Sequence, residues 1–202
     1  MPTDAPSARD RLLDAAVARV RQQGFGSTSV DTLCADAGVT KGAFFHHFRS
    51  KEALGVAAAD HWSRTTAAVF SGGAWHADPD PVARILGYID FRRDLIQGTP
   101  ADFTCLAGTM VQEVHATSPA IREACRRSIH GHAETLEADF AAAIAAHGVI
   151  GTTAASLALH TQAVLQGGFI LSKASGDAAP AIASIAHLRR YLVLLFGEGD
   201  RR

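Results

Sequence analysis

Residues 39–54, VTKGAFFHHFRSKEAL, combine three phenylalanines, two adjacent histidines and three basic residues. Imidazole nitrogens can bind a metal ion or form hydrogen bonds, and lysine ammonium groups pair with anions. Phenylalanine rings fill a core or lie against a partner. The segment is therefore a metal site, part of a hydrophobic core, or a surface that contacts another molecule.

The spacing of the histidines argues against a metal site. His46 and His47 are adjacent, so on a helix their side chains point about 100° apart. His130 and His132 are two positions apart and point to nearly opposite sides of a helix. The sequence contains no H-x-x-x-H or E-x-x-H spacing, and its three cysteines form no C-x-x-C pair. We therefore expect no metal site.

Motifs of hydrolases and nucleotide-binding enzymes are also missing. The sequence has no G-x-S-x-G, no G-x-x-x-x-G-K-[ST], and no G-x-G-x-x-G after a strand. Nothing in the sequence favours an enzyme or a bound cofactor, and we expect neither.

The elements that would position residues 39–54 are predicted to be short helices. Ser7 can cap a first helix whose apolar residues recur at i, i+3, i+4 and i+7 from Leu13 to Val20, and Gly24 ends it. A second helix, capped by Thr28 or Ser29, has the same spacing and ends at a glycine. A third helix follows a tight turn. Two short helices joined in this way are typical of a helix-turn-helix motif.

The third helix has residue types that suit contact with DNA. It begins after Thr40 and has about two turns before Phe48, with Lys41, Ala43 and His46 predicted to face outward. Phe44 and Phe48 lie four positions apart and are predicted to fill the core. The major groove admits such a helix, whose first residues meet base edges, while hydroxyls and lysines meet phosphates.

Residues 28–54 resemble the DNA-binding signature of TetR-family transcriptional regulators. The resemblance covers about the first quarter of the chain, and the family's usual tyrosine is replaced by Phe45, which lacks the hydroxyl that typically meets a phosphate. The matching positions are Thr28, Ala37, Gly38, Val39, Thr40, Gly42, His47, Phe48, Lys51, Glu52 and Leu54. The DNA contacts that the resemblance implies are Thr28, Thr40, Lys41, Gly42, Ala43, Phe45, His46, His47 and Lys51.

Composition is consistent with a helical protein and says little about nucleic acid. The chain has 202 residues, 48% hydrophobic and 19% charged, with a formal net charge of -1. Within residues 1–55, seven Lys and Arg face six Asp and Glu, so tight DNA binding would require a dimer. The N-terminus lacks the apolar segment of a signal peptide, and no apolar run approaches a membrane span of about 20 residues. We expect a cytoplasmic protein with no membrane partner.

Longer helices are predicted after residue 54, separated by glycine- and proline-containing breaks such as residues 71–81 and 146–153. The fold class is predicted to be all-α with about nine helices. We place a helix-turn-helix DNA-binding domain at residues 1–52 and an effector-binding and dimerisation domain at residues 53–202. The boundary falls inside a helix, which predicts a rigid link.

The second domain is predicted to bind a small molecule, because the resemblance implies an effector there that releases DNA. Ordinary core packing is the alternative role for each residue. Asp102 can cap a helix that places Cys105 in its first turn, where a thiol gains reactivity, so Cys105 either senses electrophiles or oxidants or only packs. The predicted pocket residues are Trp62, Phe91, Leu95, Phe103, Cys105, Leu106, Met110, Phe140 and Phe169.

Two apolar helices near the C-terminus, within residues 157–171 and 182–196, are predicted to form a four-helix dimer interface, as the resemblance implies. Burial of these residues within one chain is the alternative. The predicted interface residues are Leu157, Val164, Leu165, Gly168, Leu171, Ile185, Leu188, Leu192 and Leu195.

The sequence thus predicts a ligand-responsive transcriptional regulator: a repressor that binds a palindromic operator as a homodimer and is released by a small-molecule effector. The alternative is a helical small-molecule binding protein without specific DNA binding. The sequence names neither the effector, nor the operator, nor the regulated genes, and it does not separate repression from activation.

Overall fold

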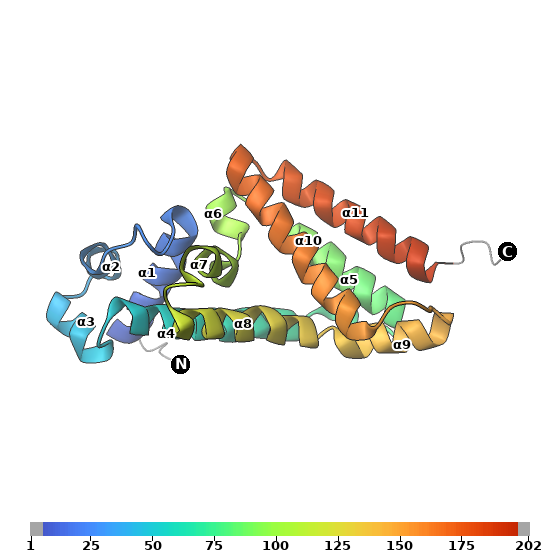
Figure 1. The fold of residues 1–202 in the computed structure, drawn as a ribbon, viewed down its shortest axis with the longest axis horizontal. Helices are drawn as coiled ribbons and strands as arrows, with labels where there is room; N and C mark the ends of the chain where they lie inside the picture. The colour runs from blue at the N-terminus through green and yellow to red at the C-terminus, as the bar shows by residue number, and fades with distance from the viewer. Residues whose placement is uncertain (1–5, 198–202) are drawn as a thin grey trace. The chain divides into compact units, whose positions relative to one another are not determined.

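A computed structural model describes residues 6–197, and every regular element in that range is a helix (Figure 1). The predicted all-α fold class is therefore confirmed. The outer ends of both predicted domains, residues 1–5 and 198–202, lie outside the described residues. The helices are α1 Ala8–Gln23, α2 Val30–Ala37, α3 Lys41–His47, α4 Lys51–Ser71, the 3-10 helix η1 Ala74–Ala77, α5 Pro81–Asp94, α6 Pro100–Phe103, α7 Leu106–Val114, α8 Pro119–Glu134, α9 Glu137–His147, α10 Ala154–Ser175 and α11 Ala179–Phe196.

Local hydrogen bonds fix the first three helices where the sequence predicts them. The hydroxyls of Ser7, Ser29 and Thr40 each accept a hydrogen bond from the backbone N–H three residues later, which begins α1, α2 and α3. Gly38 ends α2 in the left-handed conformation, with φ of 61°. Because that conformation disfavours other residues, glycine there sets the tight turn between α2 and α3.

The chain divides into two compact units, and the first combines the N-terminal helices up to Thr66 with Thr104–Ser128. Its core contains Phe44 and Phe48, which are 0% and 4% exposed, so the prediction that these two rings are core residues is confirmed. Arg19 makes a two-pronged ion pair with Asp36 at 2.7 and 2.8 Å, which joins α1 to α2.

Helix α7 belongs to this first unit because it binds the loop between α1 and α2. The Glu113 carboxylate accepts hydrogen bonds from the backbone N–H groups of Phe25 and Gly26, at 3.1 and 2.7 Å. Gly24 has φ of 88°, and a Cβ there would lie 2.3 Å from Glu113 Oε1, so the loop requires glycine at this position. The unit that contains the helix-turn-helix is thus larger than the predicted domain of residues 1–52.

The second unit contains Ala67–Phe103 and the described residues from Ile129 onward. Helices α10 and α11 run antiparallel and side by side, and α5 and α9 pack against them (Figure 1). A Cβ at Gly168 would lie 3.1 Å from Ala181 Cα, so glycine permits the close approach of α10 to α11. The long apolar helices are therefore packed within one chain.

The described residues contain more helices than the nine predicted. The sequence contains no clear signal for the break between α8 and α9, where the Thr135 hydroxyl donates to the His132 carbonyl at 2.7 Å and competes with the helical ladder. Asp102 lies within the short α6, which ends before α7 begins. Cys105, and not Asp102, caps α7, with its Sγ accepting from Gly108 N–H at 3.4 Å.

Among the described helices, α11 is long and apolar enough to cross a membrane by length and composition alone, with a mean hydropathy of 1.2 over 18 residues. No helix of this kind was expected from the sequence. The alternation of buried and exposed positions along α11 is typical of an amphipathic helix that packs on one side, and Arg189 pairs with Asp90 of α5 at 3.0 Å.

Candidate functional site

The outward surface of α3 is the candidate DNA-contacting surface. Lys41, Gly42, Phe45, His46 and His47 are all exposed, whereas Ala43 is half-buried. Phe45 is 53% exposed, although Phe44 beside it is fully buried. An exposed phenylalanine on a short, capped helix costs solvation free energy in the isolated protein, and it suits a surface that is covered by a partner.

Lys41 is held by a neighbouring carboxylate. Its Nζ lies 2.8 Å from Asp31 Oδ1, and both side chains are exposed. The hydrogen bond to Asp31 and the charge of that carboxylate raise the pKa of Lys41. Asp31, at the start of α2, therefore competes with any other anionic or polar partner of Lys41.

The structure contradicts the prediction that Thr28 contacts DNA, because its side chain is buried. Its side chain is 1% exposed, and its hydroxyl donates to the Gly24 carbonyl at 2.7 Å. A hydroxyl buried in this way cannot reach a phosphate. Ser29 is exposed and caps α2, so it is the hydroxyl that this segment presents to solvent. Thr40 is also exposed, and its cap uses the oxygen as an acceptor, which leaves its own O–H to donate.

Lys51 has partners inside its own unit. Its Nζ donates to the Gly26 carbonyl at 3.2 Å and lies 4.5 Å from the centre of the Phe25 ring. Burial lowers the pKa of Lys51, and the nearby Glu113 carboxylate opposes that effect. These contacts make Lys51 a residue that positions the α1–α2 loop, and any phosphate must compete with them.

Two arginines near α3 were missing from the predicted contacts. Arg49 is exposed directly after α3 and has no ion pair within residues 6–197. Arg9 lies with its guanidinium 5.5 Å from the centre of the Phe48 ring. Arg49 was identifiable as a basic residue next to the motif, whereas the position of Arg9 depends on how α1 packs against the end of α3.

The predicted effector-pocket residues are divided between the two units. Leu106, Met110 and Phe140 are fully buried, whereas Leu95 is 41% exposed. Within the first unit, Trp62 has the Arg21 guanidinium 5.0 Å from its ring centre. Trp62, Cys105, Leu106 and Met110 belong to the first unit, and Phe91, Leu95, Phe103, Phe140 and Phe169 belong to the second.

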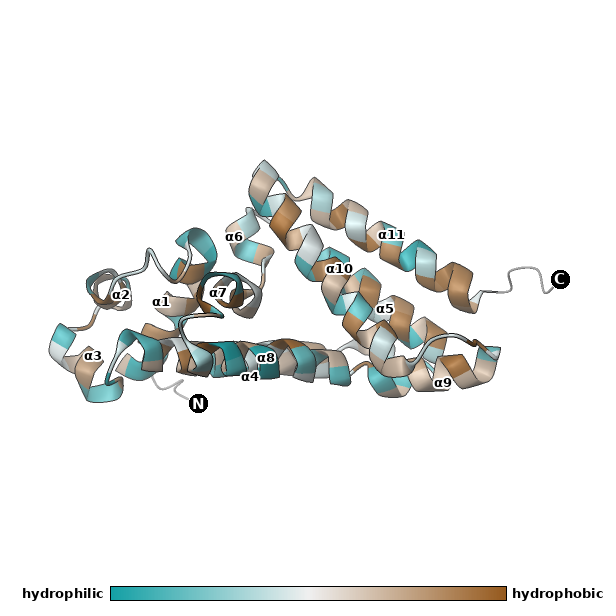
Figure 2. Cartoon of the chain, in the orientation of Figure 1, coloured by the Kyte–Doolittle hydropathy of each residue, from teal (hydrophilic) through white to brown (hydrophobic). Residues whose placement is uncertain are grey.

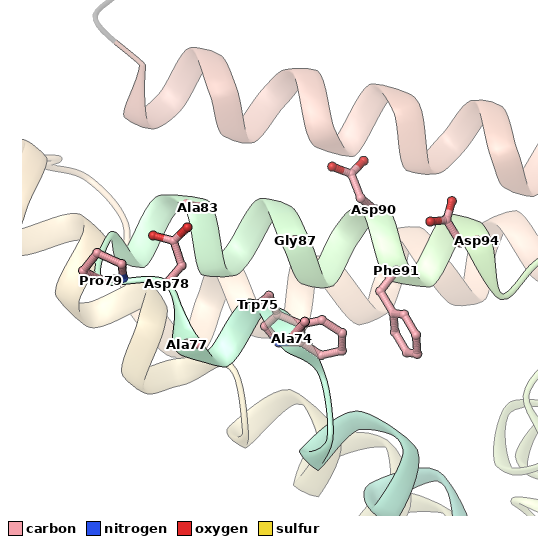
Figure 3. A pocket seen from close by; sticks show the side chains of 10 residues that line it. All are labelled: Ala74, Trp75, Ala77, Asp78, Pro79, Ala83, Gly87, Asp90, Phe91 and Asp94. Atoms are coloured by element: carbon pink, nitrogen blue, oxygen red, sulfur yellow. The ribbon is translucent and has the colours of Figure 1, made fainter.

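A groove of about 660 Å³ lies along α5 and η1 in the second unit, and Phe91 is the one predicted pocket residue that lines it (Figure 3). Trp75 adds a second aromatic wall, with its ring centre 4.8 Å from that of Phe91. Asp78, Asp90 and Asp94 line the groove, Asp90 and Asp94 are paired with arginines, and the Asp90 carboxylate points towards α11 (Figure 3).

A hydrogen-bonded cluster of polar side chains lies inside the second unit. Tyr88 Oη is 2.8 Å from His132 Nε2, and Gln162 Nε2 donates to Tyr88 Oη at 3.4 Å. Burial, followed by the charge of Arg92, lowers the pKa of His132 to about 4. Since His132 is then neutral at pH 7, its Nε2 accepts the Tyr88 proton. The sequence analysis missed this cluster because its members are distant in sequence.

Most of the residues predicted for the dimer interface are instead buried within one chain. Leu157, Leu165, Ile185, Leu188 and Leu192 are each 1% to 3% exposed within one chain, and their side chains belong to the core of the second unit. Gly168 is buried as well, while Val164 and Leu195 are half-buried and Leu171 is 55% exposed. The apolar residues that α10 and α11 expose are Leu159, Ile170, Leu171, Ile182, Tyr191, Val193 and Leu194.

We name this set the exposed α10–α11 surface. Apolar positions recur along both helices (Figure 2), and Leu194 is 69% exposed. The rings of His160 and Tyr191 are 5.6 Å apart, which joins the two helices at this surface. Exposed apolar side chains on two neighbouring helices are typical of a protein–protein contact.

Two family models match the chain. The model described as "Bacterial regulatory proteins, tetR family" matches residues 12–58, which contain the helix-turn-helix. The model described as "Transcriptional regulator LmrA/YxaF-like, C-terminal domain" matches residues 81–186, more than half of the chain.

Known proteins agree with these matches. UidR from Escherichia coli (strain K12) is 41% identical over 54 residues, 27% of this chain and 28% of UidR. AcuR from Cereibacter sphaeroides is 26% identical over 121 residues, 60% of this chain and 55% of AcuR. The chain thus matches only part of the length of these relatives.

A solved structure extends the likeness to most of the chain. A TetR transcriptional regulator from Chloroflexus aurantiacus is 27% identical and has a TM-score of 0.79, and the match covers 92% of this chain and 94% of that one. Since the helix-turn-helix, the C-terminal helical region and the fold all match, this chain belongs to the TetR family of bacterial transcriptional regulators.

Proposed function

We propose that this chain is a repressor whose homodimer binds a palindromic operator through α3 and leaves it when a small molecule binds. The observation that best supports this proposal is the exposed surface of α3. Lys41, Phe45, His46 and His47 are all exposed there, and so is Gly42. Helix α3 follows a glycine turn and begins at the exposed Thr40 cap, so its N-terminal residues are presented for base contacts in the major groove.

The side chains of α3 divide by the contacts that we propose for them. Lys41 donates to guanine once it leaves Asp31, and Phe45 lies against the sugar-phosphate edge or a thymine methyl group. Thr40, His46 and His47 supply hydrogen bonds. Ser29 and Arg49 replace Thr28 as partners of phosphates, because both are exposed.

Dimerisation supplies the second α3. We propose that the exposed α10–α11 surface, with Leu194 and Ile170 among its most exposed apolar residues, pairs with the same surface of a second copy. A two-fold axis then brings the two α3 helices to successive major grooves, about 34–36 Å apart. This pairing also covers apolar side chains that are costly to leave in water.

The effector is proposed to act in the second unit, where polar and aromatic side chains lie together. Tyr88, His132 and Gln162 form a hydrogen-bonded cluster beside the Phe70 ring. A ligand that binds one arrangement of the helices better than the other shifts the population away from the DNA-binding state. As a DNA-binding regulator, the protein is proposed to act in the cytoplasm.

A mobility-shift experiment tests the DNA-binding proposal. The protein is titrated onto DNA from upstream of its own gene and onto a scrambled sequence of equal length. We expect a preference of about 1000-fold or more for the cognate DNA. Lys41→Ala is expected to reduce this preference, whereas a variant of a phosphate contact, Arg49→Ala, weakens binding to both sequences alike.

Equal binding to both DNAs, or none to either, favours the alternative of a small-molecule binding protein without specific DNA recognition. Two observations support this alternative. Phe45 lacks a hydroxyl that could bind a phosphate, and Lys41 is paired with Asp31 in the free protein. An equal loss on both DNAs for Lys41→Ala contradicts its role in base recognition.

A further inference from the structure

Arg92 on α5 lacks the carboxylate partner that Arg84 and Arg93 on the same helix have. Arg84 pairs with Asp139 at 2.7 Å, and Arg93 pairs with Asp94 at 2.9 Å. Within residues 6–197, Arg92 makes no ion pair and no hydrogen bond, although it is half-buried. A cation that is partly removed from water without an anion is costly, so an anion from outside the chain would stabilise Arg92.

Aromatic rings, and not acceptors, surround this guanidinium. Its Cζ lies 5.1 Å from the centre of the Phe70 ring and 5.8 Å from that of Phe169. Ring faces attract a cation, but they accept few of the five N–H groups of arginine. The Arg92 donors are therefore held in place by packing while they remain available to an incoming acceptor.

Neutral hydrogen-bonding groups lie beside Arg92. Tyr88 is one helical turn before Arg92 on α5, and its hydroxyl bonds His132 Nε2 at 2.8 Å. The Phe70 ring contacts both of these side chains, since its centre is 4.6 Å from the centre of the His132 ring and 5.7 Å from that of the Tyr88 ring. The charge of Arg92 helps to keep the pKa of His132 low, so no second cation competes for an anion at neutral pH.

We propose that Arg92 binds the carboxylate of a small organic acid whose apolar body lies against Phe70 and Phe169. A carboxylate matches the planar guanidinium through two parallel hydrogen bonds and supplies the anion that the protein does not. This proposal rests on the proposed function, because it names the chemical class of the effector. It also predicts that the effector region is positively charged, so that it binds an anionic compound in preference to a neutral or cationic one.

The outer groove of α5 is a poor place for the same ligand. Gly87, Asp90, Phe91 and Asp94 share one side of the helix (Figure 3), and the Asp90 and Asp94 carboxylates already pair with Arg93 and Arg189. An organic anion would have to displace these carboxylates to reach either arginine. Tyr88 and Arg92 share another side, where the guanidinium has aromatic neighbours and, among the described residues, no carboxylate partner, so the anion belongs with Arg92.

Calorimetry on the full-length protein tests the proposal. The probes are butyrate, octanoate, benzoate and 3-phenylpropionate, each paired with its primary amide, which has the same shape and no charge. We expect at least one carboxylate to bind about tenfold or more tightly than its amide. If every amide binds as well as its acid, or if none of the acids binds, the proposal is wrong.

Variants assign that selectivity to Arg92. Arg92→Gln is expected to abolish the difference between acid and amide, whereas Arg92→Lys retains part of it, because it keeps the charge and loses the two-pronged geometry. Arg93→Gln is the matched control: it removes the same charge from the same helix at an exposed, ion-paired position. The proposal is overturned if Arg92→Gln keeps the selectivity or if Arg93→Gln loses it.

A mobility shift with the same probes separates this proposal from the proposed function. Binding of an acid that depends on Arg92 supports the site even when the DNA complex persists, and that result contradicts only release by this ligand class. Release of DNA by an amide, unchanged in Arg92→Gln, supports an effector-controlled regulator and overturns the role of Arg92.

Discussion

His132 is an imidazole that burial keeps uncharged. The lowering of its pKa from 6.5 to about 4 is caused first by burial and second by the charge of Arg92. The unfolded chain binds a proton on this residue below pH 6.5, but the folded chain does so only near pH 4. Its contribution to stability is therefore full above pH 6.5 and is lost as the pH falls from 6.5 to 4.

We expect His132→Gln to reduce the acid sensitivity of the protein. In urea unfolding, the wild type should lose about 2 kcal/mol more stability than His132→Gln between pH 7.5 and pH 5, because glutamine does not titrate. Tyr88→Phe is the control, since it removes the hydrogen bond to His132 but leaves burial, the larger cause, in place. An NMR titration that places the His132 pKa near 6.5 would contradict the expectation.

Asp31 limits the charge that α3 offers to DNA. We expect Asp31→Asn to tighten DNA binding by roughly three- to tenfold at low salt, because it frees Lys41 and removes an anion beside the phosphates. Mobility shifts at two salt concentrations measure the effect, which should shrink as salt increases. Asp60→Asn makes the same change in net charge on α4, at a carboxylate paired with Arg127, and should leave affinity unchanged. A similar gain in both variants would indicate a general charge effect.

At the scale of elements, α7 and the α1–α2 loop depend on one another. Glu113 accepts from two backbone N–H groups of the loop, while Lys51 binds the Gly26 carbonyl from α4. The loop that precedes α2 is thus held by two helices whose residues lie far apart in the sequence. A shift of α7 would move the entry to the helix-turn-helix.

Glu113→Gln leaves one acceptor oxygen for the two N–H groups of Phe25 and Gly26. We expect it to lower the free energy of unfolding by about 1 kcal/mol and to weaken DNA binding, because the loop before α2 loses a charge-assisted hydrogen bond. Urea unfolding and mobility shifts measure the two effects. Glu123→Gln is the control, since Glu123 is an exposed carboxylate of α8 that pairs with Arg126. Unchanged DNA binding in Glu113→Gln would show that α7 does not position the loop.

At the scale of the whole molecule, the chain belongs to the TetR family of bacterial transcriptional regulators. The proposed dimer depends on side chains that one chain leaves uncovered. Leu194 is 69% exposed on α11 and has no place in the core of the second unit.

We expect Leu194→Glu to convert the dimer to a monomer, because a pair of carboxylates related by the two-fold axis would be buried together. Light scattering measures the mass, and DNA affinity should fall with it. Val69→Glu is the control: Val69 is 49% exposed on α4 and is not part of the exposed α10–α11 surface. A dimeric Leu194→Glu variant would place the interface elsewhere.

Much of the DNA-binding region was predictable because its determinants are local. The caps at Ser7, Ser29 and Thr40 act over three residues, and Gly38 sets a turn by its own conformation. Such features are present in the sequence itself. The fold class followed from them, together with the apolar periodicity of the later helices, and the family followed from the resemblance of residues 28–54 to the TetR signature.

The tertiary structure decided which face of each helix is covered. The periodicity marks Leu188 and Leu194 alike as apolar, but only packing of α10 against α11 buries the first and exposes the second. Packing likewise buried Thr28, placed the Gly26 carbonyl as an acceptor for Lys51, and left Arg92 without an anion. These outcomes depend on contacts between residues distant in sequence, which a linear pattern does not contain, whereas caps and turns are fixed by neighbours along the chain.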